Sequence, residues 1–152
     1  MHQCSFELND RPMSAFGIGT LSWPAFSGQG RHVNKRTSAC IVGLGPIPPG
    51  EYHIFDRQSG GRLEAFRNLF SDHGGWFALY AIDGKIDDET LCDKIKRGNF
   101  RLHPKGPRGI SEGCITIEAI SDFQRVSAVL RSSAPSVVPG RELKAYGKVV
   151  VK

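Results

Sequence analysis

Short segments in which apolar and polar residues alternate recur along this chain, and glycine or proline separates one segment from the next. Alternation with a period of two is typical of strands that bury one face. The pattern predicts strands at residues 5–8, 21–26, 51–55, 76–82, 99–103, 114–117 and 142–151. Strands with a minority of helix indicate a mainly β chain, folded as a β-sandwich or as an α+β domain.

Residues 87–98 interrupt the alternation and predict a short helix. Acidic side chains at 87–89 would occupy its first turn, Leu91 and Ile95 stand four residues apart as an apolar pair, and basic residues precede Gly98. Negative charge at the start, positive charge at the end and a closing glycine are all signals of helix ends.

A second helix is predicted to begin at Ser121, where Gln124 follows three residues later to complete a capping box. Its apolar residues recur at helical spacing and would be buried: Phe123, Val126 and Leu130. Pro135 would end it, because proline cannot continue a helix. The sequence therefore predicts two short helices among the strands.

The length and composition fit one domain spanning residues 1–152. Hydrophobic residues make up 39% of the chain and charged residues 23%, both ordinary for a globular protein. No apolar run approaches the roughly 18 residues that a membrane-spanning helix needs. The first residues lack the basic segment followed by an apolar one that marks a secretory signal peptide, so none is expected.

The net charge is +5, from 20 Lys and Arg against 15 Asp and Glu. The basic residues occur in short clusters without interleaved aromatic residues, which is not the pattern of a single-strand nucleic-acid binder. We therefore expect no nucleic-acid partner.

The stretch HPKGPRGISEGC, residues 103–114, carries the most specific candidate chemistry. His103 ends a predicted strand, on the face opposite the apolar Phe100 and Leu102, and a loop rich in glycine and proline follows. Gly113 tolerates a positive φ, so the backbone can turn Cys114 and the neighbouring N–H groups toward one pocket.

A cysteine near a histidine can act as a nucleophile, because the imidazole accepts the thiol proton and backbone N–H groups stabilise the oxyanion. Ser111 could orient the loop or a substrate through its hydroxyl. The alternative is a structural thiol, since free cysteine is among the most buried residue types. Alternation places Cys114 on the face opposite Ile115 and Ile117, which argues against a plain core position.

Five segments, in order, resemble the type VI secretion L,D-transpeptidase effectors, a family of antibacterial toxins. They are PAFSGQG, GPIPPGEYHIFDRQSGGRL, WFALY, KIDD and RGNFRLHPKGPRGISEGCITI, and they run from about Trp23 to Ile117. The histidine, the loop and the Ser-x-Gly-Cys ending also resemble the wider YkuD-type L,D-transpeptidases. The resemblance implies a YkuD-like β-sandwich and a cysteine enzyme that acts on peptidoglycan stem peptides.

The resemblance makes Cys114 the nucleophile and His103 the general base. It makes Ser111 and Gly113 motif residues, with the N–H groups of Gly113 and Cys114 as oxyanion donors. Cys114 would form a thioester with a tetrapeptide stem and release its terminal D-alanine, which is L,D-carboxypeptidase action. Exchange with a D-amino acid would be L,D-transpeptidase action. One departure is Thr116, which stands where many of the wall enzymes carry Arg or Asn.

Five residues are candidate substrate contacts by position or chemistry: His73, Trp76, Tyr80, Arg108 and Thr116. Trp76 and Tyr80 share one face of a predicted strand and could line a groove. Arg108 could bind a carboxylate of the stem peptide. His73 precedes the same strand as Trp76, although a histidine on a surface loop is the alternative.

Three cysteines remain once Cys114 is assigned: Cys4, Cys40 and Cys92. They lack C-x-x-C spacing, so no zinc site is expected, and nothing in the sequence implies a cofactor. Three cysteines allow at most one disulfide, which a periplasm would support and a reducing cytoplasm would not. The sequence does not choose the pair.

The family resemblance implies peptidoglycan stems as the substrate, with an immunity protein and a component of the secretion apparatus as partners. A protein of this kind would be made in the producer's cytoplasm and would act in the periplasm of a target bacterium. Two other interpretations stay open. One is a cysteine peptidase or amidase of different specificity, and the other is a non-enzymatic domain that binds the cell wall.

Overall fold

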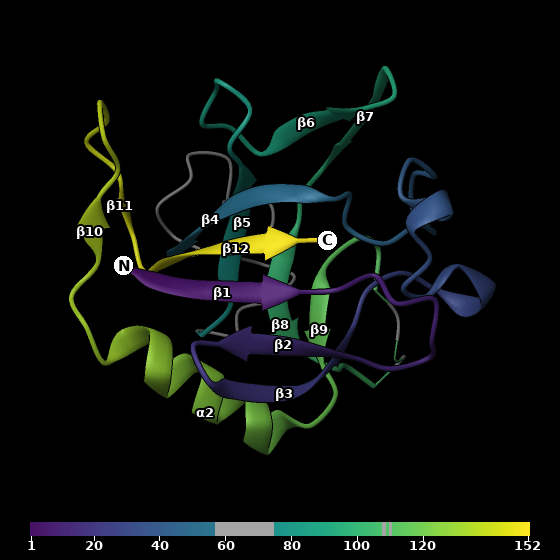
Figure 1. Ribbon diagram of the computed structural model, residues 1–152, viewed down its shortest axis with the longest axis horizontal. Helices are drawn as coiled ribbons and strands as arrows, with labels where there is room; N and C mark the ends of the chain where they lie inside the picture. Colours follow the sequence, from purple (N-terminus) through teal and green to yellow (C-terminus); the bar gives the residue numbers. More distant parts are fainter. Residues whose placement is uncertain (57–74, 108, 110) are drawn as a thin grey trace.

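The computed structural model describes residues 1–56, 75–107, 109 and 111–152, and Figure 1 shows its strands gathered around a common interior. The strands are β1 (His2–Phe6), β2 (Ser14–Ile18), β3 (Leu21–Phe26), β4 (Gly50–Asp56), β5 (Phe77–Ala81), β6 (Glu89–Cys92), β7 (Ile95–Gly98), β8 (Arg101–Pro104), β9 (Ile115–Ile117), β10 (Ser136–Val137), β11 (Lys144–Ala145) and β12 (Gly147–Val151). The helices are the α-helix α2 (Ile120–Arg131) and the short 3-10 helices η1 (Gly30–His32) and η2 (Arg36–Ser38).

The main sheet closes on itself. Its strand order is β1-β12-β4-β5-β8-β9-β3-β2, and β2 pairs back onto β1. Two neighbouring pairs are parallel, β1 with β12 and β8 with β9, and the others are antiparallel. The prediction of a mainly β chain is confirmed. The structure has a closed barrel where a sandwich was predicted, because alternation tells which face of a strand is buried and not which strands pair.

Apolar side chains from alternate strand positions fill the barrel interior. The fully buried ones include Phe6, Phe16, Ile54, Leu79, Leu102, Ile115 and Ile117. The helix α2 lies across one end of the barrel, at the bottom of Figure 1, and contributes to the same core. Because these side chains fill the interior, the outer face and the rim are where a substrate can bind.

The helix α2 confirms one of the two predicted helices. Its buried residues are the predicted ones: Phe123, Val126 and Leu130. The predicted capping box is wrong, because the helix begins one residue earlier, at Ile120. Its N-cap is Ala119, which makes no side-chain cap hydrogen bond.

Most predicted strands are present. The strand β3 has the predicted bounds, and β4, β5, β8 and β9 lie within a residue or two of theirs. The segment predicted as one strand at 142–151 is divided at Tyr146 into β11 and β12. The strands β2 and β10 were not predicted, and β1 begins at His2 where the pattern predicts a strand at 5–8.

The predicted helix at residues 87–98 is wrong, because this segment forms a hairpin of β6 and β7. Asp93 and Lys94 make its turn with φ values of 48° and 68°, which the favoured two-residue hairpin turns require. Leu91 is 68% exposed and Ile95 45% exposed. The apolar pair is therefore not buried and does not stabilise a helix against the core. Contacts between the hairpin and distant parts of the chain outweigh the local signals of helix ends.

Two long-range ties hold the hairpin to the loop at residues 39–46. A disulfide joins Cys40 to Cys92, which are 52 residues apart, and so settles the pair that the sequence left open. The guanidinium of Arg97, which is 4% exposed, donates hydrogen bonds to the carbonyl oxygens of Ala39, Gly45 and Pro46. The hairpin and this loop therefore form one continuous unit.

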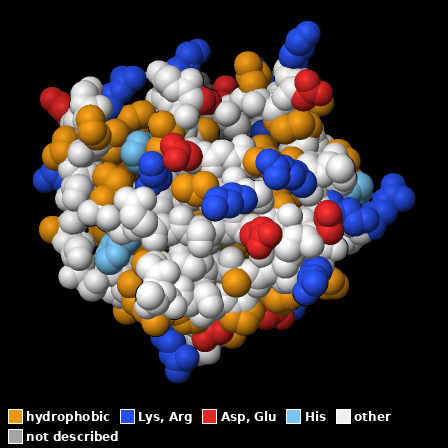
Figure 2. All heavy atoms as spheres, in the orientation of Figure 1, with side chains coloured by type: hydrophobic (Ala, Val, Ile, Leu, Met, Phe, Trp, Pro, Cys, Tyr) orange, Lys and Arg blue, Asp and Glu red, His pale blue; other side chains and the backbone are white. Residues whose placement is uncertain are grey.

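Charge is mixed over the face of the molecule shown in Figure 2. Lys and Arg side chains stand among acidic and apolar ones there and do not gather into one basic patch. This agrees with the diffuse charge of +5. In the described part of the chain, no helix is both long and apolar enough to cross a bilayer.

Candidate active site

The parallel strands β8 and β9 bring the histidine and the cysteine of the motif to one face of the barrel. Leu102 pairs with Ile115 and His103 pairs with Thr116. The same register, extended back by one residue, places Arg101 of β8 beside Cys114. Leu102 and Ile115 point into the core. Because side chains alternate along a strand, His103, Thr116 and Cys114 share the opposite, outer face.

His103 is held in one orientation and is 7% exposed. Its Nδ1 lies 2.7 Å from the carbonyl oxygen of Pro104. A carbonyl oxygen only accepts, so Nδ1 carries the hydrogen and Nε2 of the neutral ring is the basic nitrogen. Nε2 lies 3.5 Å from the Thr116 hydroxyl. The indole of Trp76 stacks on the imidazole, with ring centroids 4.4 Å apart and planes 20° from parallel.

The turn that leads into Cys114 is fixed by Ser111 and Gly113. The Ser111 hydroxyl donates to the carbonyl oxygen of Cys114 at 2.7 Å and accepts the N–H of Gly28 at 3.4 Å. Gly113 has a φ of 97°, which favours glycine. A Cβ at this position would stand 2.9 Å from the Phe100 ring. The two motif residues therefore shape the loop that presents the thiol.

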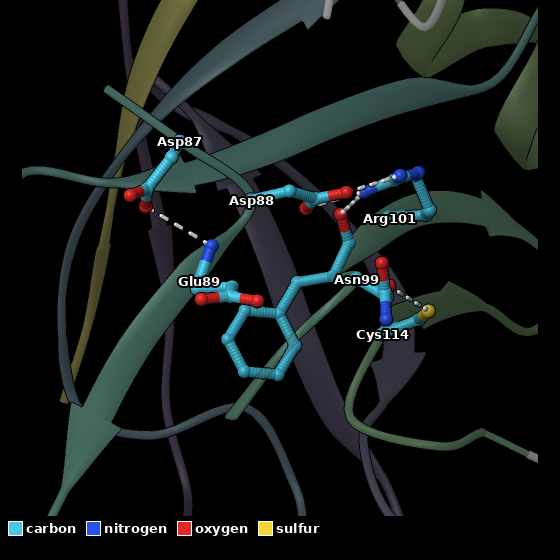
Figure 3. A network of polar contacts seen from close by, with 7 residues as sticks. Asp87, Asp88, Glu89, Asn99, Arg101 and Cys114 are labelled. Atoms are coloured by element: carbon cyan, nitrogen blue, oxygen red, sulfur yellow. Dashed lines mark hydrogen bonds and ion pairs between the residues drawn. The ribbon is translucent and has the colours of Figure 1, made fainter. Parts of the chain in front are cut away.

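The thiol of Cys114 is protonated at neutral pH. Burial raises the pKa of Cys114 from 9.0 to about 11, and a backbone hydrogen bond and the positive charge of Arg101 act in the opposite direction. The thiol donates to the carbonyl oxygen of Asn99, with Sγ and oxygen 3.8 Å apart, as Figure 3 shows. A base that takes the proton is therefore required before the sulfur can attack.

An ion pair beside the thiol was not predicted from the sequence. The Arg101 guanidinium donates to both carboxylate oxygens of Asp88, at 2.9 and 2.6 Å, and Figure 3 shows the pair next to Asn99 and Cys114. Burial by itself lowers the pKa of Arg101, but the hydrogen bond and charge of Asp88 raise it overall. Arg101 stands two residues before His103, and alternation along the predicted strand puts both on the face opposite Phe100 and Leu102; the partner Asp88 has no such local signal.

Of the predicted substrate contacts, Trp76 and Thr116 lie beside His103, whereas Tyr80 does not. Tyr80 is 6% exposed and packs on Phe55, with centroids 5.3 Å apart, in a separate apolar cluster. Thr116 is fully buried beside the imidazole. Trp76 lies directly on that ring. His73 and Arg108 lie outside the described residues.

Two further observations concern the described residues outside this motif. Within the described residues, no group of three or more His, Cys, Asp or Glu side chains could hold a metal ion. A shallow depression of about 370 Å³ is lined by β6, Asp83, Asp87 and Lys96. Neither Cys114 nor His103 lines it, so the chemistry of the motif lies elsewhere.

Comparison with known proteins adds the family. The model of the Tlde1 domain matches residues 22–141, a span that begins in β3 and includes both His103 and Cys114. Searches among curated proteins and among solved structures found no match. The family match covers most of the chain, as the ordered motifs predicted. The chain belongs to the Tlde1 domain family, the type VI secretion effectors of the L,D-transpeptidase type.

Proposed function

We propose that this protein modifies peptidoglycan by acyl transfer through Cys114, acting on tetrapeptide stems. One observation carries the proposal: the hydrogen bond from Nδ1 to Pro104 leaves Nε2 of His103 basic, on the same barrel face as the thiol. The thiol is protonated at neutral pH, so a fixed base on that face supplies what the nucleophile lacks.

In the first half-reaction, Sγ of Cys114 attacks the carbonyl that precedes the terminal D-alanine, and His103 Nε2 takes the thiol proton. The tetrahedral oxyanion accepts hydrogen bonds from the N–H groups of Gly113 and Cys114. As the intermediate collapses, the C–N bond breaks and the imidazolium gives its proton to the departing amine. The products are free D-alanine and a thioester between the stem and Cys114.

In the second half-reaction, His103 removes a proton from the acceptor that attacks the thioester. Water gives a tripeptide stem and regenerates the thiol, which makes the protein an L,D-carboxypeptidase and a hydrolase. The amine of a free D-amino acid gives exchange, and the amine of a second stem gives a crosslink. Both of these outcomes are L,D-transpeptidase reactions, and the same thioester serves all three.

Substrate contacts follow from the surroundings of this pair. Trp76 covers His103 and is the proposed wall against which the stem lies, because an indole face offers apolar area beside a reacting group. The Thr116 hydroxyl, 3.5 Å from Nε2, is buried and is proposed to act on the end of the stem through the imidazole that it orients. His73 and Arg108 are proposed as more distant contacts, whereas Tyr80, buried on Phe55, is proposed to support the site without touching the stem.

Mass spectrometry of purified tetrapeptide muropeptides tests the reaction, with and without an added D-amino acid. Wild-type protein should produce tripeptide and, when the amino acid is present, exchanged tetrapeptide. Cys114→Ala should produce neither, and His103→Ala should reduce both by about 10²-fold or more because the base is lost. His32→Ala, which changes a histidine of η1, is the matched control and should behave as wild type.

The same experiment separates the other interpretations. Cleavage at a different bond would indicate a peptidase or amidase of other specificity. Binding of muropeptides without any mass change would indicate a non-enzymatic wall-binding domain. Full activity in Cys114→Ala would overturn the assignment of the nucleophile.

The family implies secretion into target cells. We propose that the protein acts in the periplasm of those cells, where the stems are. An immunity protein that covers Cys114 and a component of the secretion apparatus are its proposed partners. Affinity purification of the tagged protein from a producing strain, with mass spectrometry of the captured proteins, would test for both partners.

A further inference from the structure

Asp88 holds two residues that hydrogen-bond to the thiol of Cys114, Asn99 and Arg101. Its carboxylate accepts two hydrogen bonds from the Arg101 guanidinium, and its backbone carbonyl accepts the N–H of Asn99 at 3.1 Å. Asn99 in turn accepts the thiol hydrogen, and the Arg101 backbone hydrogen-bonds to the sulfur. Figure 3 shows the Asp88–Arg101 ion pair and the contact of the thiol with Asn99.

We propose that Arg101, fixed by Asp88, is a positioning residue that sets the reactivity of Cys114. The proposal rests on the proposed function, since it concerns the nucleophile of that reaction. Arg101 follows from the register as the residue beside Cys114 on the neighbouring parallel strand. Its guanidinium is directed at Asp88 and at the carbonyl oxygen of Phe100, 2.8 Å away, so it has one orientation beside the sulfur.

The geometry explains why an ion pair and not a single charge stands here. The Arg101 side chain is 5% exposed and that of Asp88 20% exposed, and an arginine so buried needs a partner for its charge. A two-pronged contact with a carboxylate fixes the plane of the guanidinium. The two-pronged contact therefore holds the guanidinium and the carboxylate in one arrangement, from which both charges act on the thiol.

The charged and titratable groups around the thiol come from three segments: Arg101 and His103 on β8, Asp88 and Arg97 on the hairpin segment, and Glu112 on the loop before Cys114. Glu112 and Asp88 disfavour the thiolate, whereas Arg101 favours it. Loss of Arg101 would leave two carboxylates near the sulfur with less to oppose them. The thiolate that forms when His103 takes the proton would then be harder to reach.

The experiment measures the rate at which iodoacetamide alkylates Cys114 between pH 7 and 9.5, followed on the Cys114 peptide by mass spectrometry. Arg101→Gln removes the cation and should slow alkylation at every pH in this range, by roughly tenfold for each unit that the thiol pKa rises. Arg101→Lys keeps a cation but loses the two-pronged contact with Asp88, so its alkylation rate should lie between those of the wild type and of Arg101→Gln. A merely structural role would move neither rate in a folded protein.

A double variant guards against misfolding. Arg101→Gln with Asp88→Asn removes both charges together and keeps hydrogen-bonding side chains, so no unpaired buried charge remains. It should also alkylate more slowly than wild type, because Arg101 acts on the sulfur more directly than Asp88 does. Arg131→Gln, which breaks the Arg131–Asp56 ion pair on α2 and β4, is the matched control and should alkylate at the wild-type rate.

Wild-type alkylation rates in both Arg101→Gln and the double variant, with circular dichroism unchanged, would overturn the proposal. Its failure is distinct from failure of the proposed function, because alkylation reports on the thiol without any substrate. If Cys114→Ala still trims stems, the proposed function fails whatever the alkylation rates are. If Cys114→Ala abolishes stem trimming but the alkylation rates are unchanged, Cys114 remains the nucleophile and Arg101 does not set the reactivity of its thiol.

Discussion

Gly113 turns the chain into Cys114 with a φ of 97°, and the space beside its Cα is already occupied. A Cβ there would approach both the Arg97 guanidinium, at 2.5 Å, and the Phe100 ring, at 2.9 Å. The residue therefore meets two independent demands, a left-handed backbone and a close approach of side chains from β7 and from the residue just before β8. Because Gly113 has no side chain, Arg97 of the hairpin can pack against the loop that carries the nucleophile.

Gly113→Ala is expected to lower the free energy of unfolding by about 3 kcal/mol, the sum of left-handed strain and overpacking. Urea denaturation followed by circular dichroism measures the loss. Gly84→Ala is the matched control, because Gly84 has a φ of 92° but nothing within 4 Å of its added Cβ. It should lose about 1 kcal/mol, from strain alone. Equal losses in the two variants would contradict the packing argument.

The sequence is informative about some residues of the site and silent about others. Strand alternation placed His103 and Cys114 on the outer face, because the period of two is a local property. The partnership of Asp88 with Arg101 joins residues 13 apart across two strands, and no local pattern encodes it. Thr116 was noted as a departure from the wider family, but its contact with His103 depends on the parallel register.

The hairpin of β6 and β7 shows how an element can be mistaken when its stabilising contacts are distant. The acidic start, basic end and closing glycine of residues 87–98 predict a helix as well as any local pattern could. The disulfide and the buried Arg97 join the segment to residues 39–46, and neither tie is visible in a window of twelve residues. Strands β3, β4 and β5 were predicted well because their burial follows the local period.

Reduction of the Cys40–Cys92 disulfide should destabilise the protein by about 4 kcal/mol, from the loop entropy that a 52-residue bridge removes in the unfolded chain. Urea denaturation with and without dithiothreitol measures the difference. The variant with Cys40→Ser and Cys92→Ser is the control and should not respond to the reductant. A reductant effect of the same size in that variant would mean that the bridge is not its source.

For the molecule as a whole, burial of thiols makes stability depend on pH in the alkaline range. Burial raises the pKa of Cys4 from 9.0 to about 12. The folded state therefore keeps a proton that the unfolded chain loses, so the contribution is fully present below pH 9 and declines as the pH rises from 9 toward 12. Burial raises the pKa of Cys114 and Tyr52 as well, which adds to the same trend.

Between pH 8 and 10.5 the free energy of unfolding should therefore fall, with Cys4 contributing about 2 kcal/mol of the loss. Urea denaturation at several pH values measures the slope. Cys4→Ala should start from a somewhat lower stability at pH 8 and then decline less steeply. A slope identical to that of the wild type would show that Cys4 does not titrate on unfolding.

The barrel closes through its last strand. β12 lies between β1 and β4, parallel to the first and antiparallel to the second, as the centre of Figure 1 shows. Until residues 147–151 are available, both neighbours present an unpaired edge, although β8 and β9 with their site residues precede this strand in the chain. During synthesis on the ribosome, the protein therefore passes through a stage in which the chemical groups of the site have emerged but the sheet that supports them is still open.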